Sequence, residues 1–173
     1  MRSASEKLYE VLVQGEPNAP ALDTGSAIVA AALLAGTRLF RNTGLDLASG
    51  IEPGGYVLID SLNDQGIELL NRFEAHVSGL RSEAVPVDER LAPLEGTGPK
   101  VSLLELVQTY EPAYDRIRSE AGVSDGEAPE MAILAAALIV HRATEVMDAD
   151  TGKAIVVQAL VHSCKTAPPP RPS

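Results

Sequence analysis

Runs of small aliphatic residues recur along this chain at helical spacing, and several of them open in the same way. Residues 23–38 and 150–165 are identical at eight of sixteen positions, which include an opening Asp-Thr-Gly and a following Ala-Ile-Val. Residues 52–62 and 128–138 repeat the scheme more weakly, each with a Pro and an aliphatic run that ends in Leu. Such a unit is typical of the first three turns of a buried helix. The pattern therefore predicts a fold built by packing these helices together.

Six helices are predicted from the apolar spacing and from the residues that begin and end each run. They cover about residues 4–14, 24–41, 53–78, 103–121, 128–147 and 151–165. Asp23 and Asp150 are expected to cap the second and the sixth helix. Capping boxes are expected at Ser3 and Ser102, each of which is followed by Glu three positions later. Pro112 is expected to kink or break the fourth helix.

The start of the third helix has a second interpretation, because residues 55–60 also resemble a buried strand that ends in Asp60. Two observations favour the helix: the segment aligns with the unit that begins at Asp23, and an apolar spacing of three and four continues beyond it. The positions with this spacing are Ile59, Leu62, Gly66, Leu69, Leu70, Phe73 and Val77. We expect one long helix here and keep the strand as the alternative.

The composition favours helices over a β-sandwich. The chain has 173 residues, 45% of them hydrophobic, but only 3% are aromatic and none is Trp. The core must therefore be aliphatic, and small aliphatic residues suit closely spaced helices. Gly36 costs about 1 kcal/mol relative to Ala within a helix, so we expect close backbone contact at this position. The fold class predicted is all-α, an irregular bundle of about six helices from a duplicated helix-pair unit.

The predicted elements divide the chain into two halves. Residues 1–78 form an N-terminal helical half, and residues 102–166 form a C-terminal helical half that shares its core. Residues 79–101 contain three prolines and are expected to cross between the halves. The proline-rich residues 167–173 are expected to be a disordered tail.

The charge of the chain limits the classes of partner. The net charge is −10, from 24 acidic and 14 basic residues, and the basic residues do not cluster in the sequence. We therefore expect no binding to nucleic acid and none to anionic membranes. The single cysteine, Cys164, cannot form an internal disulfide, and no targeting or membrane-spanning run is visible, so a cytoplasmic protein is expected.

One group of residues has the chemistry of a metal site. His141 and Glu145 continue the inward stripe of the fifth predicted helix, and His162 lies on or beside the inward face of the sixth. If these helices are antiparallel neighbours, two imidazoles and a carboxylate could bind zinc or iron. In the alternative interpretation, each His is a partly buried residue bonded to a backbone carbonyl or a carboxylate. No catalytic residue and no cofactor-binding fingerprint can be assigned from the sequence.

The leading functional hypothesis is a non-catalytic helical interaction or scaffold protein. It would act by binding another protein or by self-association, and a homodimer fits the small-residue helices. The first alternative is a small metal- or cofactor-binding enzyme that uses His141, Glu145 and His162. The second alternative is a small-molecule sensor whose ligand lies between the two halves, with the crossover as a lid.

Overall fold

The computed structural model describes residues 1–45, 51–83, 85–91 and 101–171, and it confirms the all-α class. The helices are α1 (Arg2–Gln14), α2 (Thr24–Asn42), α3 (Asp60–Ser82), α4 (Leu103–Glu120), α5 (Ala128–Arg142) and α6 (Ala149–Lys165). The described residues contain no strand, only two isolated β-bridges. None of the helices in this described part of the chain combines the length and the apolarity that a membrane span requires.

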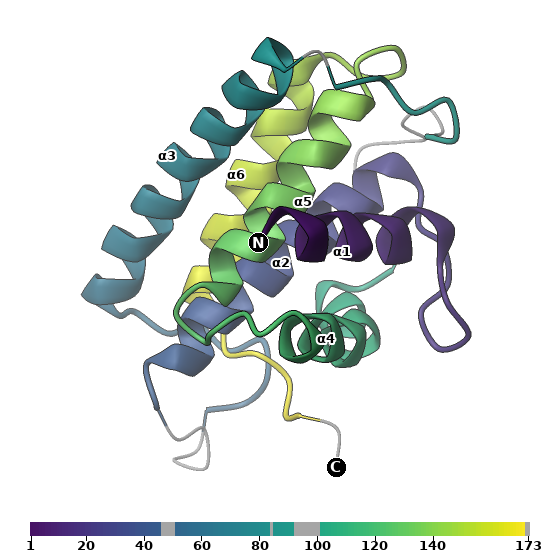
Figure 1. Cartoon of the computed structure of the whole chain (residues 1–173). Helices are drawn as coiled ribbons and strands as arrows, with labels where there is room; N and C mark the ends of the chain where they lie inside the picture. Colours follow the sequence, from purple (N-terminus) through teal and green to yellow (C-terminus); the bar gives the residue numbers. More distant parts are fainter. Residues whose placement is uncertain (46–50, 84, 92–100, 172–173) are drawn as a thin grey trace.

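Helix α2 is the central element of the bundle. It packs most extensively against α6 and α5, while α3 lies along the outer side of that pair and α1 and α4 lie on the other side (Figure 1). Every residue of α2 from Thr24 to Phe40 is buried, which is the expected environment of a helix that is apolar all round. Asp23 begins the helix as predicted, because its carboxylate accepts a hydrogen bond from the Ser26 N–H at 3.0 Å.

Glycines allow the close approach of neighbouring helices. A Cβ atom at Gly36 would overlap the Ser163 hydroxyl and lie 2.8 Å from the Ser163 Cβ, so α2 and α6 touch here. At the start of α6, a Cβ atom at Gly152 would lie 3.0 Å from the Val140 methyl groups of α5. A close contact at Gly36 was expected and is present, but the nearest atoms belong to the Ser163 and Leu160 side chains and not to the α6 backbone.

Two predicted helix caps, Ser3 and Asp150, are wrong. Helix α1 begins at Arg2, so Ser3 lies inside the helix and no side chain caps it. Helix α6 begins at Ala149, and its cap is Asp148, whose carboxylate accepts from the Thr151 N–H at 2.8 Å. Asp150 therefore lies in the first turn, two positions after the cap, whereas the aligned Asp23 is itself a cap. The duplication is not confirmed by this arrangement.

Helix α3 begins at Asp60, not near residue 53 as predicted, and residues 51–59 form neither the expected helix nor the alternative strand. Gly54 has a φ of +80°, which lies outside the helical region. Two backbone bonds of this segment reach the end of α6 and the tail beyond it: the Gly54 N–H donates to the Ala167 carbonyl at 2.8 Å, and the Val57 N–H donates to the Lys165 carbonyl at 2.8 Å. These contacts replace the hydrogen bonds of a helix turn.

The same contacts order the start of the C-terminal tail, which was expected to be disordered. Residues 167–169 are buried, and the Pro169 carbonyl accepts a hydrogen bond from Arg41 Nη2 at 2.8 Å. Prolines have no N–H group to satisfy, so this stretch needs few partners for its burial. Residues 172 and 173 lie outside the described part of the tail.

The remaining boundaries differ by smaller amounts. Helix α3 continues to Ser82, α5 ends at Arg142, and α4 runs through Pro112 without a break. Ser102 caps α4 as predicted, since its hydroxyl accepts from the Glu105 N–H. Part of the predicted crossover, at residues 84 and 92–100, lies outside the described residues. Residues 85–91 are bound to the bundle, for example through the Asp88 N–H, which donates to the Arg142 carbonyl.

Candidate functional site

The structure does not bring His141, Glu145 and His162 together. His141 lies in the last turn of α5, and His162 lies in α6, thirteen residues after Ala149. Because α5 and α6 run antiparallel (Figure 1), the end of α5 meets the start of α6. Thirteen residues of helix rise by about 20 Å, so the two imidazoles lie at opposite ends of the pair.

Each predicted ligand has a different environment. His141 Nε2 lies 2.8 Å from the Val85 carbonyl oxygen of the crossover, which is the bonding of the alternative interpretation. His162 is half-buried, and burial lowers the pKa of its imidazole. Glu145 is exposed. Among the described residues, no three His, Cys, Asp or Glu side chains are grouped so that they could hold a metal ion. This geometry gives the predicted metal site no support.

A cluster of ion pairs, whose arginines are largely buried, joins α2 to α4. Arg41 forms a two-pronged pair with Glu111, at 2.5 Å from Nε and 2.7 Å from Nη2, and both side chains are largely buried. Arg38 is 3% exposed and pairs with Asp115 at 3.2 Å and with Asp125. The acidic groups of this cluster are bound to guanidinium groups on neighbouring elements. The cluster therefore fixes α2 against α4 and against the loop that follows α4.

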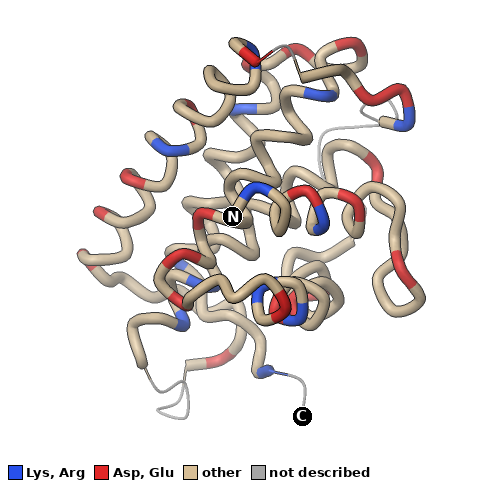
Figure 2. Tube along the Cα trace, viewed as in Figure 1, with Lys and Arg blue, Asp and Glu red and all other residues tan. Residues whose placement is uncertain are grey.

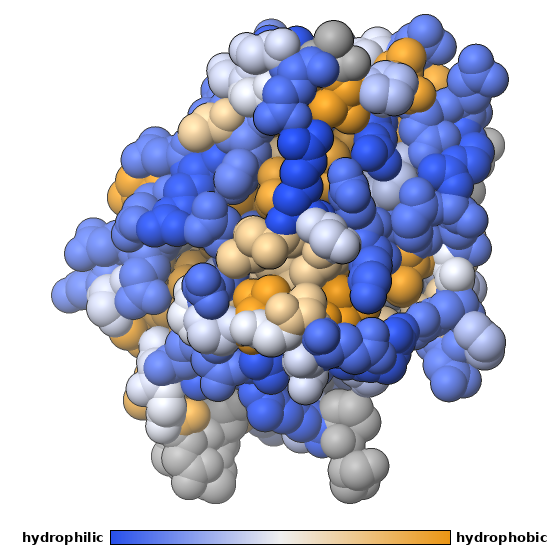
Figure 3. All heavy atoms as spheres, in the orientation of Figure 1, coloured by the Kyte–Doolittle hydropathy of each residue, from blue (hydrophilic) through white to orange (hydrophobic). Residues whose placement is uncertain are grey.

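A hollow with a volume of about 590 Å³ lies between α1 and α4. In Figure 3 apolar residues show at its floor, and hydrophilic residues cover the surface around it. Its walls carry charges of both signs that already pair with one another or with nearby residues, for example Arg116 with Glu16 at 2.5 Å and Arg90 with Glu10 at 3.1 Å. The lining of this hollow is therefore mixed: apolar residues such as Val11 and Ile117 lie among charged residues, most of which are paired.

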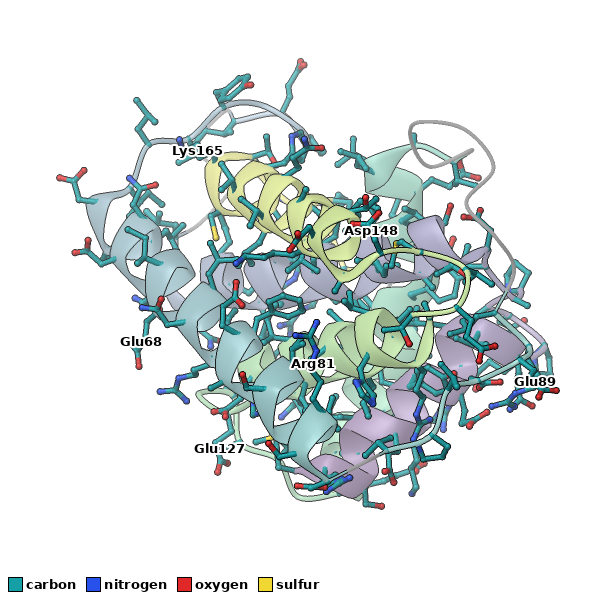
Figure 4. The ribbon with its side chains drawn as sticks, turned by 90° about the horizontal axis from the view of Figure 1, so that it is seen from above. Glu68, Arg81, Glu89, Glu127, Asp148 and Lys165 are labelled. Atoms are coloured by element: carbon teal, nitrogen blue, oxygen red, sulfur yellow. The ribbon has the colours of Figure 1, made fainter. Side chains whose placement is uncertain are left out.

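A second hollow, between α3 and α6, has a different character. The two helices are joined at one end by an ion pair between Lys153 and Glu74, and a groove of about 280 Å³ opens toward their other end. Its walls are almost wholly apolar. The lining residues are Leu62, Asn63, Gly66, Ile67, Leu70, Leu160, Val161, Cys164 and Lys165. We call this hollow the α3–α6 groove. Figure 4 shows the two helices that form it, with Lys165 at the end of α6.

Exposed apolar side chains border the α3–α6 groove. Ile67 is 60% exposed and Val161 is 41% exposed, one from each wall. Tyr56 and Leu58, each 81% exposed, flank Val57, whose backbone is bonded to Lys165 at the end of the groove. Single exposed apolar residues are common, but a group of them around an apolar hollow is typical of an interaction site.

Cys164 lies in the floor of the groove opposite Gly66. A Cβ atom at position 66 would lie 3.3 Å from the Cys164 sulfur, so the glycine leaves room for the thiol. Burial raises the pKa of the thiol to about 11. The sulfur is therefore a neutral, apolar part of the wall at neutral pH and lacks the thiolate of a nucleophile.

Sequence reasoning missed this groove, although one signal of it was present. The buried face of α3 carries Leu62, Gly66, Leu69, Phe73 and Val77, which were identified from their spacing. Ile67 does not share the helical phase of these residues, since one residue turns a helix by about 100°. An Ile out of phase with the core stripe is a sign of a second apolar face.

Comparison of the chain with protein-family models, with curated proteins and with solved structures found no significant match.

Proposed function

We propose that this chain is a non-catalytic helical protein that acts by binding another protein through the α3–α6 groove. The observation that carries the proposal is the apolar groove itself, with Ile67 and Val161 exposed in its lining and the exposed Tyr56 and Leu58 on the segment that bonds to Lys165. Burying such side chains against a partner removes apolar surface from water, at about 25 cal/mol per Å². Exposed aromatic and aliphatic anchors around a pocket are the usual centre of a protein interface.

The chemistry of the groove supports binding over catalysis. Its ionisable lining residues are Cys164, whose thiol is neutral at pH 7, and Lys165. Neither has a neighbouring base or acid within the groove that would make a nucleophile or a proton relay. The polar clusters elsewhere, such as Arg41 with Glu111, consist of charges that are already paired.

A small-molecule sensor is the second candidate. The groove lies between α3 of the N-terminal half and α6 of the C-terminal half, which is where such a ligand was expected. Its volume of about 280 Å³ is slightly below the range of about 300–1,000 Å³ that is usual for small-molecule sites. Native mass spectrometry of the purified protein separates this candidate, because a stoichiometric small-molecule adduct would favour it over protein binding.

The proposed function is tested by photo-crosslinking in the cells that produce the protein. A photoreactive amino acid is placed at Ile67 or Leu58, beside the groove, and at Leu45 or Val87 as matched exposed apolar controls. We expect both groove positions to crosslink to the same protein and the controls to give no such product. Equal products from groove and control positions, or none from the groove, would reject protein binding at this surface.

A further inference from the structure

We infer that the partner segment in the α3–α6 groove is an amphipathic helix of a different protein, with Lys or Arg along the flank that meets Asp60 and Asp64. This inference rests on the proposed function and names the chemistry of its partner. Three features of the groove carry it: its lack of backbone-bonding groups, its length, and the charge along its α3 edge.

The first feature concerns the backbone of the bound segment. Asn63 and Lys165 are the only polar side chains among the groove-lining residues. An extended peptide in this groove would leave buried N–H and C=O groups without partners, which costs free energy for each group. Sheet extension needs an exposed strand edge, and the described residues contain no strand. An α-helix satisfies its own backbone, so it is the form of chain that an apolar groove can bind.

The second feature is length. The α3 wall of the groove extends from Leu62 to Leu70, which are eight residues apart and so about 12 Å apart along the helix. The anchors of an amphipathic helix at positions i and i+7 are about 10.5 Å apart. Two turns of a partner helix therefore match the wall, with its apolar side chains meeting Ile67 on one side and Val161 on the other.

The third feature is the acidic edge of the groove on α3. Asp60 and Asp64 precede the lining residues Asn63 and Ile67 by three positions each, so they lie beside them on the helix surface. Both are exposed, and neither forms an ion pair with a described residue. The next acids of α3 differ, since Glu68 pairs with Arg72 at 2.7 Å and Glu74 pairs with Lys153. Acidic residues recur along α3 in Figure 2, and Figure 4 shows Glu68 turned away from α6.

The charge also distinguishes a foreign helix from a second copy of this chain. Two-fold self-association would bring the same patch of each copy together. Each copy would bring two acidic residues, Asp60 and Asp64, and one basic residue, Lys165, to the contact, so two copies with the same excess of negative charge would repel each other. A basic flank on a different protein faces no such repulsion.

The test uses three synthetic 18-residue Ala-based peptides as probes. The first carries Leu at positions i, i+3 and i+7 with Lys beside that stripe, and the second replaces each Lys by Glu. The third has the composition of the first with its Leu residues spread around the helix. Binding is measured by fluorescence anisotropy at low salt, and the site is mapped by methyl NMR.

We expect the first peptide to bind and to shift the methyl signals of Ile67, Leu70 and Val161, but not those of Leu45 and Val87. The double variant Asp60→Asn, Asp64→Asn should weaken its binding about fivefold, as expected for the loss of two exposed charge contacts. The variant Glu89→Gln, Glu145→Gln changes the net charge equally at exposed sites that lack ion pairs, and it should leave binding unchanged.

Four results would overturn the inference. The first is tight binding of the acidic or the scrambled peptide, and the second is equal weakening of peptide binding by both double variants. The third is methyl shifts confined to other surfaces of the protein, and the fourth is a homodimer that Val161→Glu dissociates. The first three would leave the proposed function standing if crosslinking from Ile67 and Leu58 still identifies one partner. Failure of that crosslinking would instead reject the proposed function itself.

Discussion

Replacing Gly36 by Ala is expected to destabilise the fold, although Ala is ordinarily the better helix residue. The intrinsic preference for Ala in a helix would stabilise the protein by about 1 kcal/mol. Against this, the new Cβ atom would lie 2.8 Å from the Ser163 Cβ, overlap the Ser163 hydroxyl and lie 3.3 Å from the Leu160 Cδ1. Forcing α2 and α6 apart by such overpacking costs about 1–3 kcal/mol. We therefore expect a net loss of about 1 kcal/mol in the free energy of unfolding.

Urea unfolding followed by circular dichroism measures this loss, and two further variants make it specific. Gly79→Ala is the matched control, because a Cβ atom at this helical glycine of α3 meets nothing within 4 Å. It should stabilise the protein by about 0.5–1 kcal/mol. Adding Ser163→Gly to Gly36→Ala removes the overlapping atoms and should recover most of the loss that Gly36→Ala causes. Stabilisation by Gly36→Ala equal to that by Gly79→Ala would refute the described contact between α2 and α6.

Three other predictions concern charges. Glu111→Gln leaves the largely buried Arg41 without its carboxylate and should lower the free energy of unfolding by about 3 kcal/mol in the same urea assay. The control Glu68→Gln breaks an exposed ion pair and should lower it by less than about 0.5 kcal/mol. Asp148→Ala should lower the melting temperature more than Asp150→Ala, because only Asp148 caps α6; equal effects in calorimetry would contradict that cap. Hydrogen bonds from the Arg90 guanidinium and, to a lesser extent, from the Tyr9 hydroxyl hold the pKa of Asp88 well below its ordinary value of 3.8. The stability that this carboxylate adds is therefore present above pH 4 and is lost as the pH falls through the lowered pKa. The stability difference between the natural chain and Asp88→Asn should therefore be constant above pH 4 and shrink below it, which urea titrations at several pH values can measure.

The sequence was sufficient for the class of the fold because its signals are local. Caps such as Asp23 and Ser102 act within one turn of their own helix, and the aliphatic composition leaves few alternatives to closely packed helices. The start of α3 could not be predicted in this way. Gly54, Gly55 and Val57 form backbone bonds with Lys165 and Ala167, more than a hundred positions away, and no local pattern indicates such a partner.

The candidate sites show the same division between local and long-range information. His141 and His162 do lie in helices, but which ends of α5 and α6 meet depends on the tertiary arrangement, and that arrangement separates them. The groove was missed because an exposed Ile67 and a buried Leu69 look alike in a pattern of apolar residues. Only packing reveals that α3 and α6 leave a hollow between them where Gly66 faces Cys164.

The most direct test of the account compares stability and binding in one variant, Val161→Glu. Val161 is 41% exposed, so the charge should change the unfolding free energy by less than about 1 kcal/mol. In the same variant, photo-crosslinking from position 67 to the partner should be lost, because a carboxylate then lies inside the apolar wall. An intact fold without the crosslink is the result that the account predicts. A crosslink of undiminished yield in the folded variant would contradict the claim that the α3–α6 groove is where this protein binds its partner.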